Sequence, residues 1–301
     1  MVQAKVSLGA AARSGFLLLT FVSPLAAIQI ANYDTLTNDR FANDNSFVAD
    51  QFDLSGVGFN GTGSGGAGWV TMISENVYIT ANHADPAVGS TVTFYASNDP
   101  NGTSVNRTIS SNRQQIQGTD ILVGTLDSAL PSGFTFYDFA TEDIVNNGDL
   151  QNSPYNGANA YILGRSPTGW PTSQNMAVGR NVLDGFQSSV TAPGGTGSAF
   201  EATDDGASGV TYEAMLQGGD SGAPLFVENS QGGLTIVGIN WYIRNSSTIL
   251  GATYVGNYDD QDTNGNDGIQ TFIDANPVPE PSTVAFLLTV ASGVLALRRK
   301  V

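Results

Sequence analysis

Residues 216–227 read LQGGDSGAPLFV, a glycine-rich turn with a serine at its tip that leads directly into an apolar run. Glycine adopts backbone conformations that other residues avoid, so the N–H groups around the serine can turn to one side. The apolar run has the length of a buried β-strand. Serine is a poor nucleophile unless a base lies beside it, so the turn predicts chemistry at Ser221 only if the chain supplies that base.

The chain has one histidine, His83, and no cysteine. His83 follows two apolar runs, 69–74 (WVTMIS) and 77–80 (VYIT), that read as a β-hairpin, so it is expected on a turn at the end of a strand. Histidine is the usual general base near neutral pH. The composition excludes a disulfide, a thiolate nucleophile, a cysteine-bound metal and a zinc site built from several histidines.

An aspartate stands near the start of another apolar run, 119–126 (TDILVGTL). A carboxylate there would be largely buried and would need a hydrogen-bonding partner, which an imidazole N–H supplies. The three residues then divide the chemistry: Ser221 attacks, His83 takes its proton, and Asp120 fixes the imidazole tautomer. The backbone N–H groups of Gly219 and Ser221 would form an oxyanion hole.

These segments resemble the histidine, aspartate and serine motifs of chymotrypsin-like serine proteases. They are 79–84 (ITANHA), 119–122 (TDIL) and 219–224 (GDSGAP), in that family's order. The resemblance implies an all-β fold of two six-stranded antiparallel β-barrels with a short C-terminal helix. It also implies a serine endopeptidase that cleaves protein or peptide substrates through an acyl-enzyme intermediate. Independently, short apolar runs between glycine and asparagine clusters favour many short strands.

The resemblance extends over most of the chain and implies a protease domain at 28–276, with the boundary between barrels near 140–155. Residues 234–242 (LTIVGINWY) resemble the strand that lines the substrate cleft, so Asn240, Trp241 and Tyr242 are expected to bind substrate by strand addition. Tyr242 stands where the family usually has a glycine that opens the specificity pocket. The base of that pocket aligns near Met215, so we expect a small or apolar residue, not arginine or lysine, before the cleaved bond.

The segment before the serine differs from the family in its activation signal. In the family, a freed N-terminal amine pairs with the aspartate before the serine, here Asp220. No activation sequence of the Ile-Val-Gly-Gly type is visible near residue 45. The sequence therefore leaves a zymogen step open.

Two other functions remain open from the sequence. Asn82 replaces the usual small residue before the histidine, and Tyr242 could block the pocket, so the chain could be a catalytically inactive surface or matrix protein that binds peptides on a trypsin-like fold. A lipase or esterase is less consistent with the sequence, because 219–223 (GDSGA) lacks the final glycine of the nucleophile elbow.

Both ends of the chain read as targeting segments. In 1–27, basic residues precede an apolar run and a small-residue cleavage site near Ala27, the order of a signal peptide; a buried helix is the alternative. Residues 277–301 contain Pro-Glu-Pro, an apolar run and the basic end 298–300 (RRK), and resemble a PEP-CTERM sorting signal; an ordinary C-terminal anchor is the alternative. The expected partners are a signal peptidase and an exosortase-type enzyme, with membrane contact only through this segment before processing. The expected location is the cell surface or extracellular matrix of a bacterium with an outer membrane.

The body between these ends is strongly acidic. Residues 28–278 contain six arginines, no lysine and 26 acidic residues. Such a surface repels nucleic acid and anionic membranes, so neither is an expected partner.

One acidic segment, 260–267 (DQDTNGND), places oxygen ligands at alternate positions and resembles the start of a calcium loop. Asp260, Asp262 and Asn264 would be the ligands, but Thr271 stands at the twelfth position, where such loops have glutamate. A solvated acidic loop is the alternative. No other cofactor or metal is expected.

Overall fold

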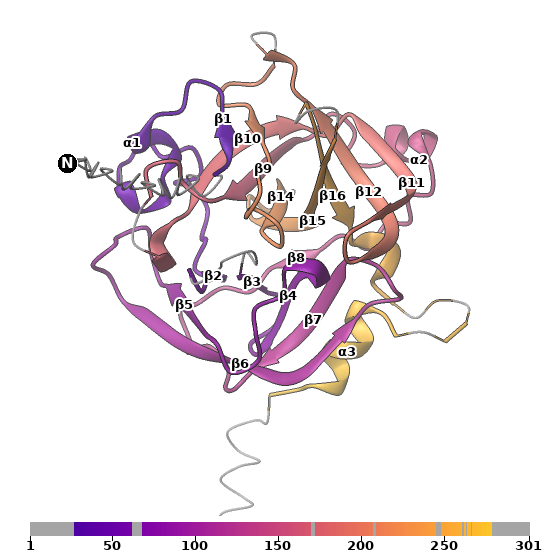
Figure 1. Cartoon of the computed structure of the whole chain (residues 1–301), viewed down its shortest axis with the longest axis horizontal. Helices are drawn as coiled ribbons and strands as arrows, with labels where there is room; N and C mark the ends of the chain where they lie inside the picture. Colours follow the sequence, from indigo (N-terminus) through magenta and orange to yellow (C-terminus); the bar gives the residue numbers. More distant parts are fainter. Residues whose placement is uncertain are drawn as a thin grey trace, which may run out of the picture.

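The structure, a computed structural model, describes residues 27–278 except 62–67, 170–171, 207–208, 245–247, 261, 263 and 266. The predicted signal and sorting segments, 1–27 and 277–301, therefore fall almost wholly outside the described residues. Strands dominate the described chain and helices are short (Figure 1). The predicted all-β class is confirmed. Within the described ranges, no helix has the length and apolar content needed to cross a bilayer.

The first half forms a closed six-stranded barrel, which lies in the lower part of Figure 1. Its strands, in spatial order, are β2 (Val57–Phe59), β3 (Trp69–Met72), β4 (Val77–Ala81), β7 (Ile121–Leu126), β6 (Ser104–Gln115) and β5 (Thr91–Tyr95). The predicted hairpin is β3–β4, with Thr71 opposite Ile79. Every residue of β4 and of β7 is buried, because one face of each strand fills the barrel and the other packs on the second half.

The second half is an eight-stranded sheet and differs from the predicted second six-stranded barrel. Its path is β10 (Ala177–Val182), β9 (Asn159–Gly164), β14 (Pro224–Glu228), β15 (Leu234–Arg244), β16 (Ile249–Tyr254), β12 (Gly195–Thr203) and β11 (Gly185–Ala192), with β8 (Asp138–Phe139) paired to β15. Two features add strands: β11 pairs with β12 as a hairpin at one edge of the sheet, and β8, from the segment that joins the halves, pairs parallel with β15.

Short elements complete the described chain. They are β1 (Gln29–Ile30), paired with β13 (Ala214–Met215), α1 (Thr35–Asn38), η1 (Arg40–Ala42), η2 (Asn82–Ala84), α2 (Asn147–Asn152), η3 (Thr172–Gln174), η5 (Gly256–Tyr258) and α3 (Ile269–Ala275). Helix α3 is the predicted C-terminal helix.

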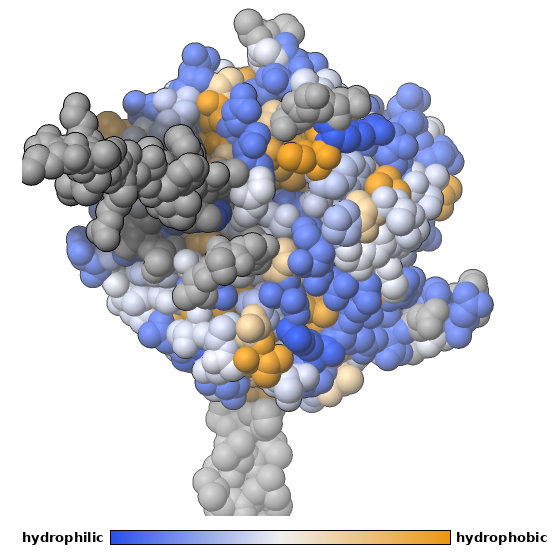
Figure 2. All heavy atoms as spheres, viewed as in Figure 1, coloured by the Kyte–Doolittle hydropathy of each residue, from blue (hydrophilic) through white to orange (hydrophobic). Residues whose placement is uncertain are grey.

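One buried apolar cluster is continuous across both halves and includes Ile79 and Val123 from the barrel and Phe226 and Ile236 from the sheet. A smaller cluster fills the barrel interior. The connecting segment, between the end of β7 and the start of β9, contains the predicted boundary near 140–155, which stays a prediction. Polar residues cover most of the face seen in Figure 2, and apolar residues form separate small patches there.

Candidate active site

Strand pairing brings the histidine and the aspartate together, although 37 residues separate them. Strand β4 ends at Ala81, which lies opposite Ile121 at the start of β7. The pairing continues one residue beyond both strand ends, because the Asn82 N–H donates to the Asp120 carbonyl at 2.7 Å. His83 follows in η2. The ladder therefore places the His83 side chain next to the Asp120 carboxylate.

His83 contacts both oxygens of that carboxylate. Its Nδ1 lies 2.7 Å from Asp120 Oδ2, and its backbone N–H donates to Oδ1 at 2.9 Å. Asp120 is fully buried, whereas the His83 side chain is 20% exposed. Burial raises the pKa of Asp120, and the hydrogen bonds from His83 act in the opposite direction. The paired contacts fix the imidazole ring and leave Nε2 as the nitrogen for another partner.

The serine turn lies against the strand end that carries His83. Gly222 has φ +87°, and a Cβ on it would be 2.7 Å from Thr80 Oγ1 and 3.3 Å from the Ala81 backbone nitrogen. Partly exposed Ser221 immediately precedes this close approach. Its hydroxyl makes no hydrogen bond to another described residue. The structure thus places the serine turn beside the strand end that precedes His83, and no hydrogen bond joins the side chains of Ser221 and His83.

The loop before the serine is held by its other polar groups. The Gly219 carbonyl accepts a hydrogen bond from Trp69 Nε1 at 3.1 Å, and the Asp220 carboxylate accepts the backbone N–H groups of Arg165 and Gln217, each at 2.8 Å. In the described part of the chain, the N–H groups of Gly219 and Ser221 donate to no acceptor. These are the two donors that the sequence predicts for an oxyanion hole.

The residues predicted to bind substrate have different environments. Met215 is buried, and its sulfur lies 3.7 Å from Asn181 Nδ2. The Asn240 side chain is also buried and donates to the Leu163 carbonyl at 2.9 Å. Its backbone pairs with the serine turn, because the Gly222 N–H donates to the Asn240 carbonyl at 3.0 Å. The side chains of Met215 and Asn240 are thus buried and hydrogen-bonded within the fold, and their role in substrate binding stays a prediction.

The two aromatic side chains that follow Asn240 also contact other parts of the chain. Trp241 is 3% exposed, and its Nε1 donates to the Pro193 carbonyl at 2.6 Å. Tyr242 and Glu201 both lie opposite Gly251, from the strands on either side of it. A Cβ on Gly251 would be 2.2 Å from the Tyr242 ring, so the ring lies directly over this glycine.

The Tyr242 hydroxyl, at the end of the side chain, is held by a hydrogen bond. It donates to Glu201 Oε1 at 2.7 Å, and Glu201 Oε2 accepts hydrogen bonds from Gln187 and Arg244. Burial, followed by the Glu201 carboxylate, raises the pKa of Tyr242. The Tyr242 ring therefore fills the space that a glycine at position 242 would leave open.

Two features of the site were not predicted from the sequence. Trp69 reaches Gly219 across 150 residues, and the turn between β11 and β12 reaches the Asp120 carboxylate. The Pro193-Gly194 pair is a turn signal in the sequence. Nothing local indicates what either feature contacts.

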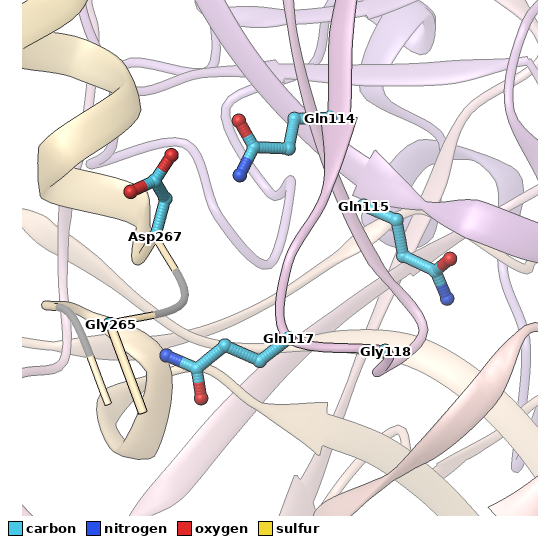
Figure 3. A pocket seen from close by; sticks show the side chains of 6 residues that line it. All are labelled: Gln114, Gln115, Gln117, Gly118, Gly265 and Asp267. Carbon is cyan, nitrogen blue, oxygen red and sulfur yellow. The ribbon is translucent and has the colours of Figure 1, made fainter. Parts of the chain in front are cut away.

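The predicted calcium loop is partly described. Asp262 Oδ1 accepts the Asn264 backbone N–H at 2.9 Å, and the Asp260 carbonyl accepts Gln117 Nε2 at 3.1 Å. A cavity of about 340 Å³ lies between Gln114, Gln117 and Asp267 (Figure 3). In the described residues, no three histidine, cysteine or acidic side chains are grouped so that they could hold a metal ion. Calcium binding stays a prediction.

No family model matches the sequence, and no curated protein matches it. Among solved structures, the chain is similar to human heparin binding protein, with 16% identity and a TM-score of 0.46 over 71% of this chain and 88% of that chain. A mutant of human heparin binding protein gives 14% identity and a TM-score of 0.49 over 76% and 95%. An inactive mutant of the Murine Norovirus NS6 protease gives 17% identity and a TM-score of 0.40 over 66% and 92%.

Proposed function

We propose that the protein is an exported serine endopeptidase whose catalytic residues are Ser221, His83 and Asp120. The observation that carries the proposal is the 2.7 Å contact between His83 Nδ1 and a fully buried Asp120 carboxylate. A buried carboxylate holding one imidazole nitrogen leaves the other nitrogen as a base of fixed tautomer. The serine turn packs against the same strand end.

The reaction uses these groups in order. His83 Nε2 takes the proton of Ser221 Oγ as the oxygen attacks the carbonyl carbon of the peptide bond. The N–H groups of Gly219 and Ser221 stabilise the resulting oxyanion. His83 then gives the proton to the leaving amine, which departs and leaves an acyl-enzyme. Water, activated by the same imidazole, attacks the ester and releases the acid and the free serine.

Export is the second part of the proposal and rests on the sequence of the two ends. A signal peptidase would cleave near Ala27, and an exosortase-type enzyme would recognise 277–301 at the cell surface. Mass spectrometry of protein recovered from the cell envelope tests both steps: we expect a mature chain that starts near Ile28. Intact protein retained in the cytoplasm would contradict export.

The test of catalysis is labelling by a fluorophosphonate, which reacts with activated serines. The full chain, expressed with its N-terminal segment so that it can be exported, should be labelled, and Ser221→Ala and His83→Ala should not be. Ser230→Ala is the matched control: this serine is exposed on a turn after β14, so labelling should persist. Equal labelling of the wild type and Ser221→Ala would reject the assignment of the nucleophile.

A second function is favoured by one specific observation. The Tyr242 ring covers Gly251 and is held by Glu201, so the space next to the cleft strand is filled. A protein that binds peptides without cleaving them would tolerate this. Absence of labelling in correctly folded wild type, together with peptide binding, would support this second function.

A further inference from the structure

A turn from the second half of the protein lies on the Asp120 carboxylate. Strands β11 and β12 pair up to Ala192 and Gly195, so the loop between them contains only Pro193 and Gly194. Gly194 has φ +96°, and a type II turn likewise requires a positive φ at the position after a proline. The hairpin belongs to the sheet, yet its tip contacts the barrel.

The contact is too close for any other residue at the tip. A Cβ on Gly194 would be 1.7 Å from Asp120 Oδ1, 2.6 Å from Asp120 Cγ and 3.0 Å from His83 Cβ. A Cβ on Gly195 would be 2.4 Å from the Gly118 carbonyl oxygen. The glycine backbone therefore packs directly on the carboxylate and leaves no room for water on that side.

Hydrogen bonds hold the tip from both halves of the molecule. From the barrel, Asn82 Nδ2 and Gln115 Nε2 donate to the Gly194 carbonyl at 3.0 and 2.7 Å. From the sheet, Trp241 Nε1 donates to the Pro193 carbonyl at 2.6 Å. Figure 3 shows the Gln115 side chain pointing away from Asp267, whereas the Gln114 side chain extends toward it. The tip of the hairpin is thus fixed between the segment that carries His83 and strand β15.

We propose that Gly194 is a positioning residue: the Pro193-Gly194 turn clamps the Asp120 carboxylate in the orientation that holds His83. The Asp120 oxygens accept from the His83 N–H and contact Nδ1, and rotation of the carboxylate would break both contacts. The turn blocks that rotation by contact and excludes the water that would compete for the oxygens. Its effect on catalysis rests on the proposed function, but its effect on the Asp120–His83 contact does not.

The test compares two glycine-to-alanine variants at positions with nearly the same positive φ. Gly194 has φ +96°, and Gly133, on an exposed loop with no atom within 4 Å of an added Cβ, has φ +95°. Gly194→Ala should reduce the fluorophosphonate labelling rate on the order of 10²-fold, the scale of a 1 Å misplacement of a catalytic group. Gly133→Ala should be labelled at the wild-type rate.

A second readout needs no catalysis. Because His83 is the only histidine, the full chain labelled with ¹⁵N-histidine gives one imidazole spectrum. We expect the wild type and Gly133→Ala to show a strongly deshielded proton in the hydrogen bond to Asp120, and Gly194→Ala to lose it. Loss of this proton in Gly194→Ala, without labelling of the wild type, would support the clamp and reject the proposed function. An unchanged proton and labelling rate in Gly194→Ala would overturn the clamp.

If Gly194→Ala does not fold, a variant without backbone strain replaces it. Asn82→Ala combined with Gln115→Met removes both side-chain donors to the Gly194 carbonyl. The deshielded proton should then exchange faster with water and the labelling rate should fall severalfold. A wild-type spectrum and a wild-type rate in this double variant would overturn the clamp.

Discussion

Asp220 Oδ1 accepts the backbone N–H of Arg165 at 2.8 Å, and the Asp220 side chain is fully buried. Burial raises the pKa of this carboxyl to about 7, and the backbone hydrogen bonds from Arg165 and Gln217 only partly offset the effect. The charged form is therefore disfavoured in the folded protein. In the unfolded chain the pKa of the same carboxyl returns to the ordinary aspartate value, 3.8.

This difference predicts how stability depends on pH. Between about pH 4 and 7 the folded state binds more protons at Asp220 than the unfolded chain does. The stabilising contribution of Asp220 is therefore fully present below the unfolded pKa and is lost as pH rises to about 7. The slope is at most about 1.4 kcal/mol per pH unit. Urea unfolding across this pH range checks the prediction: the free energy of unfolding should fall less steeply with pH in Asp220→Asn than in the wild type. Parallel curves would contradict the prediction.

Ile28 lies next to this carboxylate and predicts an effect of N-terminal processing. It is 1% exposed, its N–H donates to the Arg165 carbonyl at 3.0 Å, and a Cβ on Gly164 would be 2.7 Å from both Ile28 Cβ and Asp220 Oδ1. In a chain that starts at Ile28, the N-terminal ammonium lies close to the Asp220 carboxylate and should lower the pKa of Asp220. We expect it to be about 1.5–3 kcal/mol more stable at pH 7.5 than a chain with two additional residues. In Asp220→Asn the two forms should be equally stable; a persisting difference would exclude the carboxylate as its cause.

Trp69→Phe should weaken the oxyanion hole without weakening substrate binding. The indole Nε1 donates to the Gly219 carbonyl, and the ring packs on Phe59 with centroids 4.5 Å apart, so phenylalanine removes mainly the donor. We expect kcat to fall roughly 10-fold, less than the 10²–10³-fold for loss of an oxyanion donor itself. KM should change little, because the hydrogen bonds of the oxyanion hole strengthen only in the transition state. Steady-state kinetics on a peptide ester checks this, and a raised KM with unchanged kcat would contradict it.

Tyr242→Ala should widen the range of side chains accepted before the cleaved bond. Removing the ring opens the space over Gly251, and Gln187 and Arg244 still hold Glu201. We expect kcat/KM for phenylalanine relative to alanine at that position to rise about 10-fold or more. Tyr242→Phe keeps the ring and is the control, so it should keep the wild-type preference. An unchanged ratio in Tyr242→Ala would show that the ring does not limit the pocket.

Short-range patterns in the chain predicted much of the fold. The hairpin at 69–80 and the apolar run at 121–126 are β3, β4 and β7, because alternation, apolar runs and turn residues act over a few neighbouring positions. The same locality placed His83 after one strand and Asp120 before another. The C-terminal helix, α3, is the one that the resemblance implied, and its apolar residues Ile269, Phe272 and Ile273 have helical spacing.

The composition of the sheet in the second half could not be predicted from local sequence patterns. The sequence indicated strands there, but the number that join one sheet depends on which edges pair. β8 adds to β15 from the connecting segment, and β11 extends the sheet by pairing with β12. Edge pairing is a long-range choice, and no short window of residues contains it.

From the residues themselves came the nucleophile, base and carboxylate candidates, because a single histidine and a glycine-rich serine turn leave few alternatives. Only the tertiary structure decided how they are held. Trp69 reaches Gly219, Gly194 packs on Asp120, and the Tyr242 ring lies over Gly251. Each contact joins segments that are distant in sequence or on different strands. Its geometry depends on strand register and on the packing of the two halves, and these arise only when the whole chain has folded.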